Sequence, residues 1–266
     1  MKNASIGIFD SGIGGLTIAH SIKEKMPNES IIYFGDTKHL PYGEKSNSAI
    51  QDFSESITKF LLQQNCKAIV IACNSASSVA YKKVKEITGS VPVFNVIDPV
   101  VNYVNKNCNN CNIGIIGTKA TIQSNIYSEK IIENNKNQKV HSLATPLLAP
   151  MIEEGFINEE ISRTIIQNYL KNPILENIDS LILACTHYPL IQEEIQQYYN
   201  NNINVIDSAN IVANYINEKL ESLNLHSETK HADYHFYVSN YTLSFEKSAQ
   251  FFFRENIKLE EITLPQ

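Results

Sequence analysis

The sequence predicts an α/β protein built on mostly parallel sheets flanked by helices. Short apolar runs rich in isoleucine and valine alternate along the chain with amphipathic helical patterns. Each run is continuously apolar, which is typical of parallel strands covered on both faces. Runs separated by helices indicate βαβ units. The expected strands lie at residues 5–9, 31–34, 68–72, 91–97, 112–116, 181–184 and 204–206.

Three helical patterns between these runs have recognisable ends. The first runs to Met26 and stops at Pro27, because proline cannot continue a helix. The second begins after Ser46, a favourable N-cap residue, and carries a stripe of apolar side chains. The third covers residues 79–88, and Gly89 is well placed to end it. The alternation of strands and helices therefore continues through the first third of the chain.

The chain also contains an internal repeat. The run IGIFDS at 6–11 resembles IGIIGT at 113–118, and AIVIACNS at 68–75 resembles SLILACTH at 180–187. The two offsets, 113 − 6 = 107 and 180 − 68 = 112 residues, are close to each other. Duplicated halves with small insertions would produce such offsets. We therefore expect two halves of similar fold.

The composition excludes several classes of protein. The chain has 266 residues, enough for one large domain or two modest ones. Its formal net charge of -6 argues against binding to nucleic acid or to anionic lipid. No run approaches the roughly 20 apolar residues of a membrane span, and the N-terminus lacks a signal-peptide pattern. Five cysteines exclude a fully paired disulfide framework, so we expect a soluble, cytoplasmic protein.

Three expected strands end in polar or reactive residues. They lead into DSGIGG at 10–15, ACNS at 72–75 and ACTHYP at 184–189. Ligands bind beyond the carboxyl ends of parallel strands, so all three are candidate sites. The glycine-rich turn could bind a dinucleotide with Asp36 near the ribose, but its glycines lack the required spacing and Asp10 would repel a pyrophosphate. A tight turn without a ligand is the other interpretation.

Two cysteines occupy matching positions in the repeat. A single cysteine at a strand end is most often a small buried hydrophobe. Cys73 and Cys185, however, both end an apolar strand and both precede polar residues where a core would contain none. A thiol becomes a base or nucleophile when a neighbouring charge tunes its pKa. Asp10 and His187 are the candidate tuning groups, so this pair is the strongest functional signal in the residues themselves.

The spacing of the remaining cysteines and of two histidines does not predict a metal site. Cys108 and Cys111 have C-x-x-C spacing, but no second pair or histidine cluster completes a zinc site. They lie in an asparagine-rich stretch and are expected to be bystanders, as is Cys66. His231 and His235 would share one face of a helix, but their surroundings indicate a strand. We therefore expect no bound metal.

Six motifs follow one another along the chain. They are GIFDSGIGGLT at 7–17, Asp36 with PYGEK at 41–45, ACNSAS at 72–77, IGTKAT at 116–121, TPLLAPMIEEG at 145–155 and LACTHYPL at 183–190. Together they resemble the motifs of the glutamate racemases in the cofactor-independent aspartate/glutamate racemase superfamily. The resemblance runs from about residue 5 to about residue 210 and continues weakly through 236–239. One such motif alone would be unspecific, whereas six at coherent spacing are highly specific.

The resemblance implies two similar, pseudo-symmetric α/β domains with the active site in the cleft between them. The first domain would comprise residues 1–97 and 209–266, and the second residues 98–208. The implied activity is the interconversion of L-glutamate and D-glutamate, which supplies D-glutamate for peptidoglycan, cell wall biogenesis and cell shape. Neither pyridoxal phosphate nor a metal takes part. The implied partners are the glutamate substrate and a second copy of the chain in a homodimer.

Racemisation removes the Cα proton from one face and returns a proton to the other, so two opposed bases suit it. The resemblance implies that Cys73 acts on D-glutamate and Cys185 on L-glutamate. Asp10 would assist Cys73, while Glu153 and His187 would assist Cys185. Hydrogen bonds to the substrate carboxylate would stabilise the carbanion in place of a cofactor. The implied substrate-binding residues are Asp10, Ser11, Pro41, Tyr42, Gly43, Asn74, Ser75, Thr118, Thr121, Thr186 and His187.

Four alternatives stay open at this point. The nearest is a racemase of another acidic amino acid, such as aspartate. A single-cysteine decarboxylase of the same superfamily is disfavoured because both cysteine positions are filled, and the intact pair also argues against a non-catalytic amino-acid-binding protein. The fourth interpretation, an NAD-dependent enzyme, is supported only by the glycine turn and Asp36. The resemblance places Asp36 near the site without a defined role. Ser75 stands where many relatives have threonine, and it keeps the hydroxyl while it lacks the methyl group. Because the first motif begins at residue 7, we also expect no activation by a cell-wall precursor.

Overall fold

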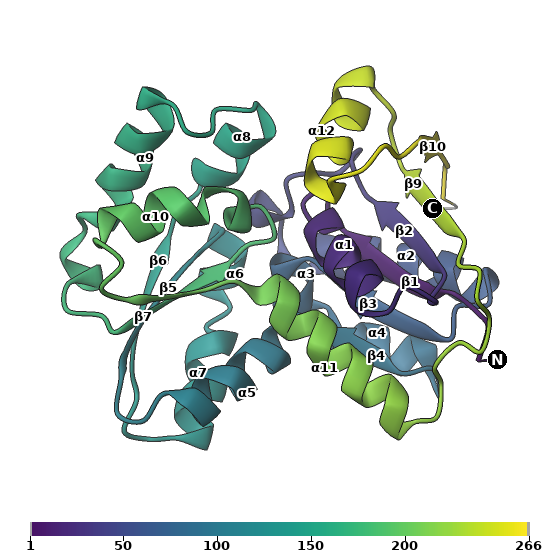
Figure 1. The fold of residues 1–266 in the computed structure, drawn as a ribbon, viewed down its shortest axis with the longest axis horizontal. Coiled ribbons are helices and arrows are strands. Elements are labelled where there is room, and N and C mark those ends of the chain that lie inside the picture. The colour runs from purple at the N-terminus through teal and green to yellow at the C-terminus, as the bar shows by residue number, and fades with distance from the viewer. Residues whose placement is uncertain (1, 265–266) are drawn as a thin grey trace.

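Two parallel sheets, one in each half of the molecule, form its centre (Figure 1). The computed structural model describes residues 2–264. The strands are β1 (Ile6–Asp10), β2 (Ile31–Gly35), β3 (Ala68–Ile71), β4 (Val93–Asn95), β5 (Asn112–Gly117), β6 (Lys139–Ala144), β7 (Ser180–Ala184), β8 (Asn204–Ile206), β9 (Tyr234–Val238) and β10 (Leu259–Glu261). The first sheet has the order β10-β9-β2-β1-β3-β4 and the second the order β6-β5-β7-β8. All strand pairs in these two sheets are parallel, which confirms the predicted α/β class.

The helices lie between the strands in sequence, as expected. They are α1 (Leu16–Lys25), α2 (Asn47–Gln63), α3 (Asn74–Val79), α4 (Tyr81–Thr88), α5 (Ile97–Asn107), α6 (Lys119–Gln123), α7 (Ile126–Asn134), α8 (Leu148–Glu153), α9 (Glu160–Leu170), α10 (Gln192–Tyr198), α11 (Ser208–Ser222) and α12 (Leu243–Phe253). Ser46 caps α2 by accepting a 3.3 Å hydrogen bond from the Ala49 N–H, and Gly89 ends α4 with φ +59°. None of the helices within residues 2–264 has the length and apolar composition needed to cross a bilayer.

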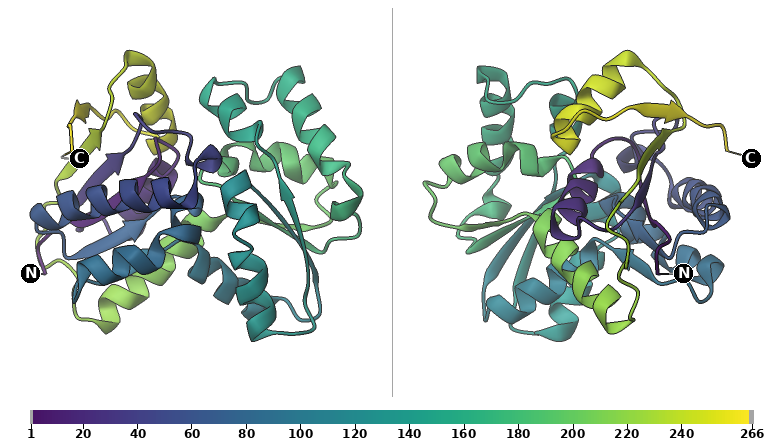
Figure 2. Two further views of the ribbon diagram at one scale, coloured as in Figure 1. Left: turned by 180° about the vertical axis from the view of Figure 1, so that it is seen from behind. Right: turned by 45° about the vertical axis from the view of Figure 1, so that its right-hand side comes forward.

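Helices cover both faces of each sheet (Figure 2). In the first sheet Ile8 and Tyr33 face the core formed with α1, α11 and α12. Phe9 and Phe34, one residue further along the same strands, face the opposite core formed with α2 and α4. The second sheet is covered by α5 and α7 on one face and by α8, α9 and α10 on the other. Burial on both faces explains why the central strands are continuously apolar.

One expected strand is too long, and the reason is local. Residues 91–97 were expected to be extended, but only Val93–Asn95 pair with a neighbour, and α5 begins at Ile97. The side-chain oxygen of Asn95 accepts hydrogen bonds of 2.9 Å from the Ile97 N–H and 2.8 Å from the Asp98 N–H. This capping turns the apolar run from strand into helix.

Two strands lacked a sequence signal because they lie at sheet edges. In β6 the sequence KVHSLA is mostly half-buried, and in β10 two of the three residues are glutamates exposed to solvent. Edge strands need no continuous apolar run, so neither was predicted. By contrast, the strand indicated around His235 is confirmed as β9, which pairs with β2.

The internal repeat is confirmed as a repeat of topology. The orders β2-β1-β3-β4 and β6-β5-β7-β8 are equivalent, with β1 matching β5 and β3 matching β7. The register agrees as well, because Ile6 pairs with Ala68 and Ile113 pairs with Ser180. These four residues begin the four repeated sequence runs. The domain boundaries near residues 97 and 209 remain our proposal, which the membership of the two sheets supports.

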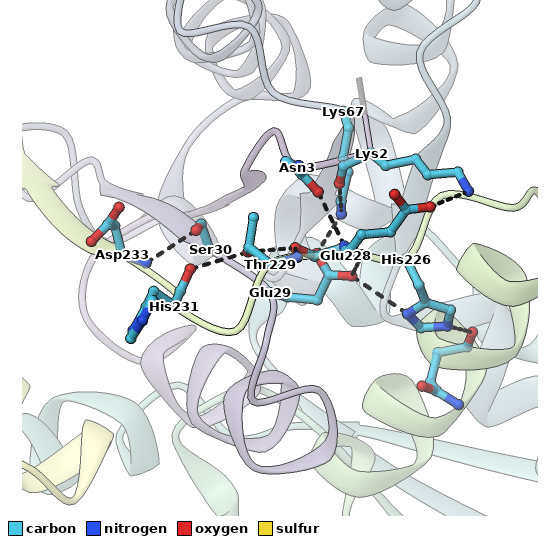
Figure 3. A network of polar contacts seen from close by, with 12 residues as sticks. Lys2, Asn3, Glu29, Ser30, Lys67, His226, Glu228, Thr229, His231 and Asp233 are labelled. Atoms are coloured by element: carbon cyan, nitrogen blue, oxygen red, sulfur yellow. Dashed lines mark hydrogen bonds and ion pairs between the residues drawn. The ribbon is translucent and has the colours of Figure 1, made fainter.

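A buried ion pair between Lys67 and Glu29 lies at the amino-terminal edge of the first sheet, where the segment after α11 also contacts it (Figure 3). Lys67, directly before β3, donates to the carboxylate of Glu29 and to the backbone carbonyl of Lys2, and both charged side chains are buried. The other oxygen of Glu29 accepts a 2.8 Å hydrogen bond from the Ser227 N–H in the segment that follows α11. This network lies at the amino ends of the strands, away from the carboxyl ends where ligands bind in such sheets.

The C-x-x-C pair forms a disulfide that the sequence did not predict. Cys108 and Cys111 are bonded to each other in the loop between α5 and β5. The C-x-x-C spacing brings their Cα atoms to 5.8 Å, which is within the range of a disulfide. An odd cysteine count excludes only complete pairing and leaves room for one bridge. Cys66, Cys73 and Cys185 are free thiols.

Candidate active site

The reactive strand ends of both sheets meet at one cavity. In each half, successive strands are added first on one side of the central strand and then on the other. This switch lies between β1 and β3 in the first half and between β5 and β7 in the second. Ligands in open α/β sheets bind at such switch points. Ser11 follows β1 and Cys73 lies beyond β3, while Thr118 follows β5 and Cys185 follows β7. All four line the same cavity between the two halves.

Most of the residues expected at the site contribute to the wall of this cavity. Asp10 and Thr121 are the exceptions, because they are buried behind the wall rather than on its surface. Three apolar or small residues that were not singled out complete the lining. The wall consists of Ser11, Leu40, Pro41, Tyr42, Gly43, Cys73, Asn74, Ser75, Thr118, Ala149, Pro150, Glu153, Cys185, Thr186 and His187.

Cys73 lies in an environment that favours the neutral thiol. It is only 5% exposed and precedes the first turn of α3. Its sulfur accepts a hydrogen bond from the Ala76 N–H at 3.5 Å and lies 3.7 Å from the hydroxyl oxygen of Ser11. Burial, followed by the negative charge of Asp10, raises the pKa of the Cys73 thiol. Asp10 therefore tunes this cysteine toward the protonated form, in which it can donate a proton.

Asp10 is fully buried and uses only one of its carboxylate oxygens within the protein. Oδ2 accepts a 2.8 Å hydrogen bond from the Gly15 N–H in the glycine-rich turn. Oδ1 has no hydrogen-bond partner among the described residues. The turn is therefore capped by an acid from its own chain, which is unsuited to a pyrophosphate and removes the basis of the dinucleotide interpretation. The second oxygen is an unused hydrogen-bond acceptor that lies buried behind the cavity wall.

Cys185 lies in the opposite electrostatic environment. Its sulfur is 3.6 Å from Nδ1 of His187, and Nε2 of that imidazole is 2.8 Å from Oε1 of Glu153. Burial would lower the pKa of His187, but its bonds with Cys185 and Glu153 outweigh burial and raise the pKa well above its ordinary value. The imidazole is therefore held as a cation, and a cation beside the sulfur stabilises a thiolate. The two cysteines thus have different neighbours: burial and a carboxylate raise the pKa of Cys73, whereas an imidazole with a raised pKa lies beside the Cys185 sulfur.

A cluster of hydroxyl groups crosses between the two halves. The Ser75 hydroxyl lies 2.9 Å from that of Thr118, which in turn lies 3.1 Å from that of Thr121. Ser75 belongs to α3 of the first half, whereas the two threonines begin α6 of the second half. Hydroxyls both donate and accept, so the cluster can turn its protons toward an anionic group. It forms part of a polar wall suited to a carboxylate.

Asp36 anchors the loop that closes the cavity on one side. Its carboxylate accepts hydrogen bonds of 2.6 Å from the Tyr42 hydroxyl and 2.7 Å from the Ser239 hydroxyl, and it contacts Nδ1 of His39 at 2.9 Å. Tyr42 and its neighbours line the cavity, while Asp36 does not. These three bonds occupy the carboxylate and define the role of Asp36, which is to position the loop.

Two glycines allow loops of the first half to reach the second. A Cβ atom on Gly14 would lie 2.4 Å from the imidazole of His187, and one on Gly43 would lie 2.7 Å from Cβ of Thr118. Real Cβ atoms do not approach other atoms so closely, so a side chain at either position would displace the neighbour. The contact of the two halves at the cavity depends on these glycines.

Comparison with known proteins agrees with this geometry. The family model described as Asp/Glu/hydantoin racemase matches residues 16–216. The chain belongs to the Asp/Glu/hydantoin racemase family. Among curated relatives, the glutamate racemase of Neisseria meningitidis is 42% identical over 246 residues, covering 92% of this chain and 90% of the relative. This racemase family membership makes the chain an amino-acid racemase, which is an isomerase.

Solved racemase structures match along almost the whole chain. The glutamate racemase of Francisella tularensis, crystallised with D-glutamate, has a TM-score of 0.94 and 40% sequence identity, with 99% of this chain and 98% of that chain covered. A glutamate racemase isoform of Bacillus anthracis has a TM-score of 0.95 and 34% identity, with 100% and 99% covered. The two-domain racemase fold that the resemblance implied is therefore confirmed.

Several contacts of this racemase site had no usable signal in the sequence. The Thr17 hydroxyl donates a 3.1 Å hydrogen bond to the Thr186 carbonyl, and the ring of Phe252 meets the His187 ring edge-on at 5.2 Å. Tyr127 donates a 2.7 Å hydrogen bond to the side chain of Asn74. Thr17 lies within a recognised motif, but Phe252 and Tyr127 do not. Each reaches the site only through packing between distant segments.

Proposed function

We propose that this racemase interconverts L-glutamate and D-glutamate by direct proton transfer between Cα and two cysteines, without a cofactor. One observation carries the proposal. Cys73 and Cys185 end equivalent strands of the two sheets and line one cavity. Burial and Asp10 raise the pKa of the Cys73 thiol, and Nδ1 of His187 lies 3.6 Å from the Cys185 sulfur. The relative of Francisella tularensis was crystallised with D-glutamate, which supports the choice of substrate.

In the L-to-D direction the proton balance is simple. The Cys185 thiolate takes the Cα proton and becomes a thiol, while the Cys73 thiol gives its proton to the opposite face of Cα and becomes a thiolate. The reverse reaction begins from D-glutamate with the two states exchanged. His187 stabilises the thiolate of Cys185 when that cysteine is the base, and Glu153 holds the imidazolium in place.

The carbanion between the two transfers needs stabilisation at the α-carboxylate. Hydroxyl and amide groups of the cavity wall suit this role, because hydrogen bonds strengthen as the carboxylate gains negative charge. Asp10 lies behind the cavity wall, and its negative charge there would attract the substrate ammonium. The loop at residues 40–43 limits the access of water to the cavity, and exclusion of water strengthens these electrostatic interactions. The residues proposed for the carboxylate are Ser11, Asn74, Ser75, Thr118, Thr121 and Thr186, with Pro41, Tyr42 and Gly43 closing the site.

The proposal extends to the biological setting. Glutamate is favoured over aspartate because the relatives and solved structures reported above, at 34–42% identity, are glutamate racemases. D-glutamate formed in this way would supply peptidoglycan synthesis. The mechanism requires Cys73 and Cys185 to be a thiol and a thiolate, which a reducing cytoplasm would preserve, although a bridge such as Cys108–Cys111 is rare in that compartment. We also propose a homodimer, in agreement with the resemblance stated above.

The decisive experiment incubates each enantiomer of glutamate with the protein in D2O without added cofactor. Optical rotation reports racemisation, and mass spectrometry reports deuterium at Cα. We expect deuterium to appear mainly in the product enantiomer, because its new proton comes from a cysteine that has exchanged with solvent. If neither rotation nor deuteration changes, the proposed function is wrong. Parallel incubations with both enantiomers of aspartate test the alternative substrate.

Cysteine variants test the mechanism separately from the substrate. Cys73→Ser and Cys185→Ser should each nearly abolish turnover, because a serine hydroxyl is a far weaker acid than a thiol. Cys66→Ser is the matched control, since Cys66 is also a free buried thiol but does not line the cavity. Full activity in either of the first two variants would refute the two-base scheme.

A further inference from the structure

A hydrogen bond links the two halves of the protein directly beside the cavity. The Tyr127 hydroxyl lies 2.7 Å from Oδ1 of Asn74. Asn74 follows Cys73 at the start of α3 in the first half and lines the cavity. Tyr127 belongs to α7 of the second half, and its ring packs in the apolar core between that helix, α5 and the second sheet. Both side chains are at least 97% buried, with exposed fractions of 2% and 3%.

The direction of this hydrogen bond follows from the needs of the phenol. A buried tyrosine hydroxyl needs an acceptor for its proton. Among the described residues, the oxygen of Asn74 is the acceptor that it finds. Burial raises the pKa of Tyr127, so the hydroxyl keeps its proton and acts as the donor. The carbonyl end of the Asn74 carboxamide is therefore turned toward Tyr127.

Fixing one end of an amide fixes the other. With Oδ1 turned toward α7, the NH2 group of Asn74 occupies the opposite side of the carboxamide. Its nitrogen is buried and has no hydrogen-bond partner among the described residues. A buried amide N–H without a partner costs free energy, which a carboxylate bound in the cavity would recover. Asn74 is thus prepared to donate to an anionic ligand, and Tyr127 sets that orientation.

We propose that Tyr127 is a positioning residue for racemisation, which holds Asn74 so that its amide N–H groups face the substrate carboxylate. This inference rests on the proposed glutamate racemase function. The hydrogen bond joins a residue of the second half to one of the first, so the orientation of Asn74 depends on the contact between the two halves at the cavity.

Thermodynamics makes any kinetic effect the same in both directions, so either enantiomer can be used to measure it. The two enantiomers of glutamate have equal free energy in an achiral solvent, so the equilibrium constant of racemisation is one. The values of kcat/KM in the two directions must then be equal in every variant. Loss of an Asn74 contact made with the α-carboxylate lowers both by the same factor.

The test is a double-mutant cycle that combines Tyr127→Phe with Asn74→Ala. Tyr127→Phe removes only the hydroxyl, and we expect kcat/KM to fall about 10-fold with either enantiomer. In the Asn74→Ala background the same substitution should cause no further loss, because there is no carboxamide left to orient. Deuterium incorporation at Cα over long incubations keeps the slow variants measurable. A merely structural role of the hydroxyl would give the same loss in both backgrounds.

Tyr234→Phe is the matched control, because it removes a tyrosine hydroxyl that bonds to a backbone carbonyl at the far side of the first sheet. It should keep the wild-type kcat/KM. Full activity of Tyr127→Phe, or an equal loss with and without Asn74, would overturn the positioning role while leaving racemisation intact. Wild-type protein that racemises neither enantiomer would overturn the proposed function, and this inference with it.

Discussion

Nε2 of His187 lies 2.8 Å from Oε1 of Glu153, so a carboxylate at the end of α8 holds the imidazole that faces Cys185. The opposite ring nitrogen lies 3.6 Å from the Cys185 sulfur. Burial would lower the pKa of this imidazole, but its two polar partners raise it well above the ordinary value. The imidazolium of His187 can therefore lie between Glu153 and Cys185, and all three side chains come from the second half.

We expect His187 to keep its proton when the pH rises past the ordinary histidine pKa of about 6.5. A raised pKa means that the protonated form persists to higher pH, so the imidazole signals should titrate only in the alkaline range. NMR titration measures this, and His187→Asn identifies the signals. Glu153→Gln removes one of the two partners and should move the midpoint to lower pH. A midpoint near 6.5 in the wild-type protein would show that Glu153 and Cys185 do not hold the proton on His187.

The same change should have a modest effect on rate. The Glu153 side chain is 23% exposed, so solvent screens part of its charge. We expect Glu153→Gln to lower kcat/KM by about 3-fold at neutral pH and to shift the alkaline decline of activity to lower pH. Glu154→Gln provides the control, because this neighbouring carboxylate is exposed to solvent and does not line the cavity. A pH profile that Glu153→Gln leaves unchanged would contradict the expectation.

Gly14 should be intolerant of a side chain. A Cβ atom there would lie 2.4 Å from the His187 ring, so Gly14→Ala must displace the imidazole from Cys185. Misplacement of a catalytic group by about 1 Å can reduce the rate about 100-fold, which is the loss of kcat we expect. Gly12→Ala, in the same turn, would bring its Cβ only to 3.6 Å from Leu40 and should retain activity. Equal activities of the two variants would show that this close contact is not required.

The sequence could predict those parts of the fold that burial determines. Central strands such as β3 and β7 are covered on both faces and therefore appear as continuous apolar runs. The edge strand β6 is half-buried and lacks such a run. At the end of β4 the apolar run continues into α5, and a hydrogen bond accepted by Asn95, rather than hydropathy, decides where the helix begins.

The candidate site could be predicted where the repeat doubles a local pattern. Cys73 and Cys185 stand out because each ends an apolar strand at equivalent positions of the two halves. Tyr127 could not be found in this way, since its bond to Asn74 joins residues 53 positions apart and depends on packing between the halves. The role of Asp36 likewise depends on Ser239, which is 203 positions away. Long-range contacts of this kind leave no periodic signal.

The ion pair between Lys67 and Glu29 should contribute strongly to stability and little to catalysis. Both side chains are buried at the amino ends of the strands, so Lys67→Met would leave a buried carboxylate without its cation (Figure 3). Breaking such a pair costs about 3–5 kcal/mol in free energy of unfolding. Urea unfolding measures the change, and activity of the folded variant should remain near the wild-type level. Lys59→Met removes an exposed pair with Glu55 and should leave the unfolding midpoint unchanged.

The two site cysteines should differ in reactivity although they are equally buried, each being 5% exposed. Burial and the charge of Asp10 raise the pKa of Cys73, while Nδ1 of His187, an imidazole whose pKa is raised, lies 3.6 Å from the Cys185 sulfur. Because the thiolate is the nucleophile, iodoacetamide at neutral pH should modify Cys185 about 10-fold faster or more. Peptide mapping by mass spectrometry measures both rates in one sample. Cys66, whose pKa burial raises to about 12, should remain unmodified.

The variant His187→Asn tests the cause of this difference. It should remove the preference for Cys185, because it removes the imidazole beside that sulfur. Faster modification of Cys73 in the wild-type protein would reverse the assignment of acid and base in the resting enzyme.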